Sequence, residues 1–182
     1  KTEFIVNSSE THQSVSFPRI SPDGKFLIFT MADYGTFPIW HKEADLYMLD
    51  LQNGKLKKME LNSNETDSYH SWSSNGKWLV FSSKRIDGRS TRPFIAYINS
   101  WDQIGKPFVL PQNDPVYYDN QVLSFNIPEL IKGKIKMNSR DFEAATKKAI
   151  IQAKSGKFEN AKPEKAKHPR NGQPEIPNSI HG

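Results

Sequence analysis

Short apolar runs separated by polar turns make up most of the chain before residue 130. The apolar run Trp78–Phe81 follows Asn75-Gly76, a strong hairpin signal because both residues tolerate positive φ. The same arrangement occurs earlier, where Asp23-Gly24 precedes the run Phe26–Phe29, and Gly24 and Gly76 are 52 residues apart. This pattern predicts antiparallel strands arranged in a repeated unit. A period of about 50 residues is typical of propeller blades, which have four strands each.

Each repeat is expected to supply four strands. The first contains Ser16–Ile20, Phe26–Thr30, Asp45–Leu51 and Lys55–Leu61, and the second contains Ser68–Ser73, Trp78–Ser83, Arg92–Ile98 and Pro107–Leu110. Glu3–Val6 is expected to be the outer strand of a preceding blade, and Val122–Ile127 one further strand. The predicted fold class is all-β, with β-propeller blades built as four-stranded antiparallel sheets.

The C-terminal part changes character. Over residues 138–155 the apolar residues Phe142, Ala145, Ala149, Ile150 and Ala153 fall on one helical face. Asn138 or Ser139 is expected to cap this helix and Gly156 to end it. From Lys157 the chain is rich in Lys, Pro and Asn with few apolar residues, so we expect it to be disordered or draped on a partner. The predicted division is 1–131 for the blades, 132–156 for a helical extension and 157–182 for a basic tail.

Composition and charge exclude several classes of site and of protein. The chain has no cysteine, which excludes disulfides, thiolate metal sites and haem attachment through Cys-x-x-Cys-His. No apolar run approaches the roughly 18–20 residues of a membrane-spanning helix. The net charge of +5 is concentrated in residues 132–182, with 12 Lys and Arg against 5 Asp and Glu. We expect a solvated tail rather than a nucleic-acid site, because no aromatic residues are interleaved with the lysines.

Several segments carry a family resemblance. Ser21–Lys25 (SPDGK), an apolar strand and Ala44–Leu51 (ADLYMLDL) together resemble the TolB-like, WD-related propeller repeat of bacterial envelope proteins. The strings Thr36–Tyr47 and Ser68–Arg85 are similar to a subgroup of TolB-like proteins. The resemblance covers about residues 15–130 and implies a periplasmic or envelope-associated propeller. Ser74-Asn75 stands where the family has Pro-Asp, a conservative change for a turn.

About two blades are accounted for, whereas closed propellers have about 4–8. We therefore expect this chain to be the C-terminal portion of a longer protein, or its blades to pack on another copy. Exposed blade edges would then favour self-association.

The resemblance also places the candidate site. In a propeller, the loop before the inner strand and the loop between the second and third strands open on the same face. That rule places four loops together on one rim: Ser8–Ser14, Met31–Glu43, Asn62–Tyr69 and Lys84–Thr91. The candidate ligand-binding residues on or beside these loops are Trp40, His41, His70, Arg85, Arg89 and Arg92.

Each candidate has a structural alternative. The arginines are suited to holding a carboxylate, or to a solvated loop with an ion pair to Asp87. His70 either faces the channel mouth or has a structural role. Trp40 and Tyr34 either stack on a sugar or peptide, or fill a gap between blades. The histidines either bind a metal or make separate hydrogen bonds, and we assign no metal and no cofactor.

The leading interpretation is a non-catalytic module that binds a protein or peptide partner through its loop rim or channel. There is no Gly-x-Ser-x-Gly, no His-Glu-x-x-His and no phosphate loop, so no catalytic residue is assigned. The alternatives are a propeller-type enzyme, such as a metal-dependent polysaccharide lyase in which His41 and His70 converge, and a carbohydrate-binding module. A carbohydrate-binding module would need the rings of Trp40 and Tyr34 to be exposed and coplanar.

Overall fold

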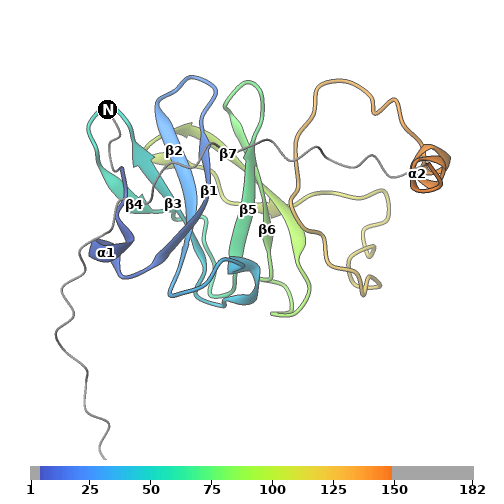
Figure 1. Cartoon of the computed structure of the whole chain (residues 1–182), viewed down its shortest axis with the longest axis horizontal. Coiled ribbons are helices and arrows are strands. Elements are labelled where there is room, and N and C mark those ends of the chain that lie inside the picture. Colours follow the sequence, from blue (N-terminus) through green and yellow to red (C-terminus); the bar gives the residue numbers. More distant parts are fainter. Residues whose placement is uncertain (1–4, 149–182) are drawn as a thin grey trace, which may run out of the picture. The chain divides into compact units, whose positions relative to one another are not determined.

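The computed structural model describes residues 5–148, and the chain divides into two compact units, 1–134 and 135–182. The first unit is built from two antiparallel sheets (Figure 1). One sheet has the order β1 (Ser14–Ile20), β2 (Phe26–Ala32), β3 (Asp45–Asp50) and β4 (Leu56–Lys58). The other has the order β5 (Asp67–Trp72), β6 (Trp78–Ser83), β7 (Arg92–Ser100) and β8 (Gln103–Ile104), with β9 (Phe108–Val109) also paired to β7. The all-β class is confirmed.

The two hairpin turns share one construction. Gly24 and Gly76 have φ of +73° and +67°, which confirms the positive φ predicted from the Asp-Gly and Asn-Gly pairs. In each turn a serine hydroxyl oxygen accepts the amide that begins the next strand. These bonds run from Phe26 to Ser21 and from Trp78 to Ser73, both at 2.9 Å. The repeat in the sequence is therefore a repeat of backbone geometry.

This geometry makes Gly76 sensitive to substitution. Gly76→Val is expected to destabilise the fold by more than about 1 kcal/mol, because a β-branched residue is strained at positive φ. A Cβ there would also lie 3.4 Å from Cδ of Pro22. Urea unfolding of the variant measures the loss. Gly76→Asn is the control, because asparagine tolerates positive φ better than a β-branched residue; an unchanged midpoint in Gly76→Val would contradict the prediction.

A second shared feature was not predicted. The ladders β1–β2 and β5–β6 both shift register, between Ser16 and Arg19 and between Ser68 and Ser71. Phe17 and Tyr69, at equivalent positions within the shifts, both have positive φ, at 55° and 49°. Their rings meet edge to face with centroids 4.8 Å apart. This aromatic contact ties the two first strands together and favours a conformation that bulky residues otherwise avoid.

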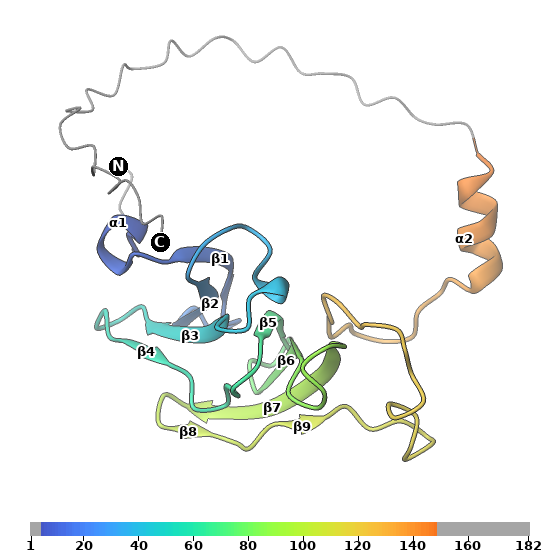
Figure 2. The same ribbon diagram turned by 90° about the horizontal axis from the view of Figure 1, so that it is seen from below.

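The main hydrophobic core lies between the two sheets (Figure 2). The first sheet contributes Ile28, Leu46 and Met48, which are all fully buried. The facing side of the second sheet contributes Leu79, Phe81, Phe94, Ala96 and Ile98. The opposite face of the first sheet carries a smaller cluster of Leu27, Phe29, Met31 and Leu49. Strand alternation thus gives β2 and β3 two apolar faces, as their near-continuous apolar runs suggest.

Several boundaries differ from the prediction. The expected strand Val122–Ile127 is wrong, because this segment is held by contacts to β6 and β7 side chains and loops rather than by a ladder. Ile5-Val6 is not a strand, and the outer strand predicted over Lys55–Leu61 shortens to β4. The structure adds α1 (Ser8–Thr11), η1 (Pro38–Trp40) and β8. α1 begins where the side chain of Asn7 caps it.

The second unit contains α2 (Ser139–Thr146). Asn138 caps the helix as predicted, and its side chain and that of Asp141 form a reciprocal capping box. The rest of the expected helix beyond residue 148, its end at Gly156 and the tail 157–182 lie outside the described residues.

Candidate functional site

Three loops meet at the end of the sheets opposite the β1–β2 and β5–β6 turns, the lower end in Figure 1. We call residues 33–44, 62–66 and 84–91 the rim. The Thr66 hydroxyl donates to the carbonyl oxygen of His41 at 2.7 Å, and the Lys84 amide donates to the carbonyl oxygen of Thr66 at 3.1 Å. Lys42 also pairs with Glu65 at 2.7 Å. The loops that the sequence placed on one face are therefore hydrogen-bonded to one another.

The rim exposes large apolar side chains. Tyr34, Phe37, Trp40 and Ile86 are 69%, 64%, 78% and 52% exposed. The Lys84 ammonium lies 4.8 Å from the centre of the Trp40 ring, within cation–π range. Exposed aromatic side chains grouped with a cation are typical of interfaces, where such residues contribute much of the binding energy.

His41 shapes the loop that carries Trp40. Its Nδ1 lies 3.2 Å from Oε1 of Glu43, and its ring meets the Tyr34 ring edge to face at 4.4 Å. Gly35, with φ of +78°, passes so close that a Cβ there would lie 3.2 Å from Nε2 of His41. His41 is thus enclosed by its own loop, and its ring packs against Tyr34.

His70 lies in the interior rather than on the rim surface. It is fully buried, and its Nε2 lies 3.0 Å from the carbonyl oxygen of Ile28. Its Nδ1 has no partner among the described residues. Burial lowers the pKa of His70 from 6.5 to about 4, with a smaller contribution from the positive charge of Arg19. These contacts favour the structural alternative for His70.

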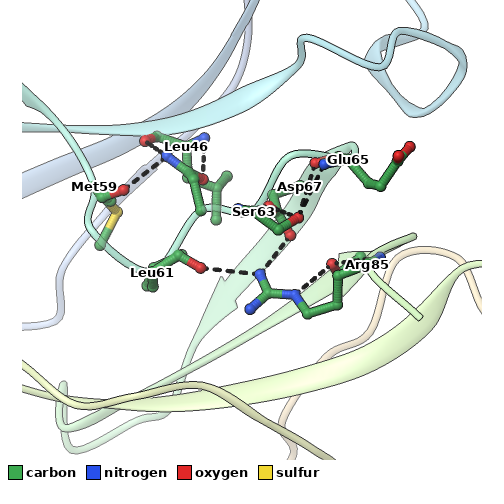
Figure 3. A network of polar contacts seen from close by, with 9 residues as sticks. Leu46, Met59, Leu61, Ser63, Glu65, Asp67 and Arg85 are labelled. Atoms are coloured by element: carbon green, nitrogen blue, oxygen red, sulfur yellow. Dashed lines mark hydrogen bonds and ion pairs between the residues drawn. The ribbon is translucent and has the colours of Figure 1, made fainter. Parts of the chain in front are cut away.

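Arg85 belongs to a buried network beneath the rim (Figure 3). Its Nη2 donates to Oδ1 of Asp67 at 2.7 Å and to the carbonyl oxygen of Leu61 at 2.9 Å. The other carboxylate oxygen of Asp67 accepts the amide and the hydroxyl of Ser63, at 2.6 and 2.8 Å. The Arg85 guanidinium also lies over the rings of Phe81 and Phe94. The partner of Arg85 is therefore Asp67, which the sequence analysis did not select, and not Asp87.

Arg92 is also buried, at 3% exposure. Its guanidinium donates to four backbone carbonyl oxygens, those of Thr91, Tyr118, Gln121 and Leu123, at 2.8–3.3 Å. Arg89, by contrast, is exposed on the rim. Of the three candidate arginines, Arg85 and Arg92 hold backbone segments together and Arg89 faces solvent.

The structure offers neither a metal cluster nor a membrane-spanning helix within residues 5–148. No group of three or more His, Cys, Asp or Glu residues within residues 5–148 is arranged to hold a metal ion. In the same part of the chain, no helix has both the length and the apolar character needed to cross a bilayer.

Comparison of the chain with known protein families and with curated proteins finds no match. Of the sequence-based candidates, the rim brings Trp40, His41 and Arg89 together with Tyr34. The sequence analysis missed Phe37 and Ile86. For Ile86 the signal was present, because it is the one large apolar residue in the polar loop 84–91, whereas Phe37 lies among other apolar residues of its loop.

Proposed function

We propose that this chain is a non-catalytic propeller module that binds a protein or peptide partner through the exposed apolar side chains of its rim. The observation that carries the proposal is the group Tyr34, Phe37, Trp40 and Ile86, all more than half exposed on loops that are hydrogen-bonded to one another. A rigid scaffold that presents such loops is a common design for recognition.

The propeller interpretation is supported by the repeat. A four-stranded and a five-stranded antiparallel sheet, with the same turn construction, the same register shift and a 52-residue spacing, pack face to face. The TolB-like resemblance of Ser21–Lys25 and Ala44–Leu51 supports a periplasmic or envelope location as part of the same proposal.

The partner's chemistry follows from the exposed groups. Aromatic and aliphatic surface favours apolar side chains, and the cations Lys84 and Arg89 favour a carboxylate. We therefore expect an apolar segment flanked by acidic residues.

A carbohydrate is the second candidate. A polar cavity of about 480 Å³ is lined by Lys42, Glu43, Asp45, Lys58, Ser63 and Asn64. Burial raises the pKa of Asp45, against the opposing effect of its ion pair with Lys58. This pocket lies beside the rim, with Asp45 on β3 and Lys58 on β4, and its carboxylate, amide and hydroxyl groups are suited to hydrogen-bonding sugar hydroxyls.

Panning a phage-displayed random peptide library against the full chain tests the proposal. Trp40→Ala and Phe37→Ser are each expected to weaken binding of the selected peptides at least tenfold, the scale of an interface hot spot. His70 and Arg85 are unsuitable here, because their substitution would disturb the interior.

The matched controls are Gln52→Ala and Lys55→Ala, in the exposed turn before β4. Thermal melts establish that every variant is folded. Unchanged binding in both rim variants, with loss in the turn variants, would show that the other end of the sheets is the binding face. Binding to a glycan array, with no peptide selected, would favour the carbohydrate alternative.

A further inference from the structure

The outer face of the second sheet lines an apolar groove. A cavity of about 370 Å³ is bounded by Ser73, Ser74, Trp78, Ile95, Phe108, Leu110, Leu130 and Ile131. A neighbouring cavity of about 480 Å³ shares Leu110 and Leu130 with it. Phe108 and Ile131 remain 46% and 60% exposed. The groove lies between the sheet and the segment 125–131, and it is separate from the rim.

The repeat shows what normally covers this face. Val80 pairs with Ile95 in the second sheet, as Ile28 pairs with Met48 in the first. The face containing Ile28 and Met48 is fully buried, because the second sheet packs on it. The groove is therefore the equivalent face of the second sheet, without the sheet that the repeat would place on it.

The segment 125–131 takes the place that the first strand would have in a third repeat, corresponding to β1 and β5. The Phe125 amide donates to the carbonyl oxygen of Thr91 at 3.1 Å, as the Asp67 amide at the start of β5 donates to that of Ala44 at 2.9 Å. Two residues after Phe125, Ile127 has a φ of 51°. Tyr69, two residues after Asp67, has a φ of 49°.

The side chains agree with this alignment. Ile127 precedes a proline, as Phe17 does in the first repeat. Leu130 falls at the position of Trp72, which packs against the core between the sheets. Glu129 falls at the position of Arg19, and the two side chains form an ion pair at 3.3 Å. The third segment thus reaches β1 through Glu129, as β5 reaches β1 through Tyr69.

The third repeat then stops. In the first two repeats the glycine turn is followed at once by β2 and β6. After Gly133, which also has positive φ at 79°, residues 135–138 form no strand and α2 begins at Ser139. The segment 125–131 is in no ladder among the described residues. Its backbone groups therefore lack the partner strand that β2 provides for β1 and β6 provides for β5.

We propose that this groove accepts an extended strand from another polypeptide, which pairs antiparallel with residues 125–131 as β6 pairs with β5. The occupant must carry large apolar side chains at alternate positions, as β6 does with Leu79 and Phe81, because one face of it packs against the groove residues Ile95 and Phe108. Addition of a strand to an unpaired edge is an established mode of peptide recognition, in which backbone bonds give affinity and side-chain pockets give specificity. The interface it forms continues the packing already present between the two sheets.

The probe is a synthetic peptide with the sequence of residues 75–85, NGKWLVFSSKR, which is the strand at the equivalent position of the second repeat. It is expected to bind the full chain and to slow hydrogen exchange of the amides of Ile127, Glu129, Leu130 and Ile131. The control peptide NGKWDVDSSKR, with aspartate at the two positions that should face the groove, is expected to bind at least tenfold more weakly.

Two protein variants locate the site. Leu130→Asp and Ile131→Asp each place a charge in the groove and should abolish the protection, whereas Val122→Asp, at a 91% exposed position outside the groove, should retain it. Thermal melts verify folding. Protection absent from residues 127–131, or unchanged in both groove variants, would overturn the proposal. Sedimentation that shows a dimer of the chain alone, dissociated by Leu130→Asp, would identify the occupant as a second copy instead.

Discussion

Asp67→Ala is expected to lower the free energy of unfolding by about 3–5 kcal/mol, the usual cost of removing one partner of a buried ion pair. The Asp67 carboxylate is fully buried and accepts from Arg85 and from both donors of Ser63. Without it, the Arg85 cation stays beneath the rim with no counter-charge, over the rings of Phe81 and Phe94. The loss is therefore one of stability first and of rim geometry second.

Chemical denaturation of Asp67→Ala beside Glu60→Ala measures this effect. Glu60 is the control because its ion pair with Lys57 spans 3.9 Å and its side chain is 73% exposed, so its loss should cost less than about 1 kcal/mol. The double variant Asp67→Ala/Arg85→Met should recover part of the stability by removing the unpaired cation. Equal, small losses in both single variants would refute the role assigned to the network.

Acid should destabilise the protein through His70 as the pH falls from 6.5 to about 4. The folded state holds the pKa of His70 near 4, against 6.5 for an exposed histidine, because the site is buried. Between these values the unfolded chain binds a proton that the folded chain does not. Stability is therefore full above pH 6.5, falls as the pH drops toward 4 and loses no more through this group below that. At about 1.4 kcal/mol per pKa unit, the total is on the order of 3 kcal/mol.

The measurement is the free energy of unfolding of the native protein and of His70→Gln at several pH values between 7 and about 4. Glutamine keeps a donor for the carbonyl oxygen of Ile28 but does not titrate. The difference between the two proteins should shrink as the pH falls, since the native protein alone pays for protonation at this site. Parallel curves across the whole range would contradict the assignment.

The strands of the two repeats were predictable because their signals are local. Asp23-Gly24 and Asn75-Gly76 form the turns, and the apolar runs beside them form the paired strands of two hairpins. The register shifts were not predictable from the sequence, because the positive φ of Phe17 and Tyr69 depends on a contact between two strands about 50 residues apart. Val122–Ile127 was misassigned for a related reason: its apolar residues match a strand, but no partner strand lies beside it among the described residues.

The candidate site shows the same division between local and distant information. The sequence and its TolB-like resemblance placed the long loops on one face, and the hydrogen bonds between them agree. The sequence did not distinguish the buried arginines Arg85 and Arg92 from the exposed Arg89, because all three lie in or beside one polar loop. Their different roles depend on Asp67 and on the carbonyl groups of residues 118–123, which are close only in the folded chain.

The four-carbonyl contact of Arg92 has an evolutionary consequence. Every residue type presents a backbone carbonyl, so a guanidinium that binds only such groups places no demand on the side chains it holds at Gln121 and Leu123. Substitutions of those side chains leave the contact intact. Substitution of Arg92 does not, since even lysine lacks the planar fork of five donors. In related chains we therefore expect arginine to be retained at position 92. The segment 118–123 is expected to keep its backbone conformation while its side chains vary.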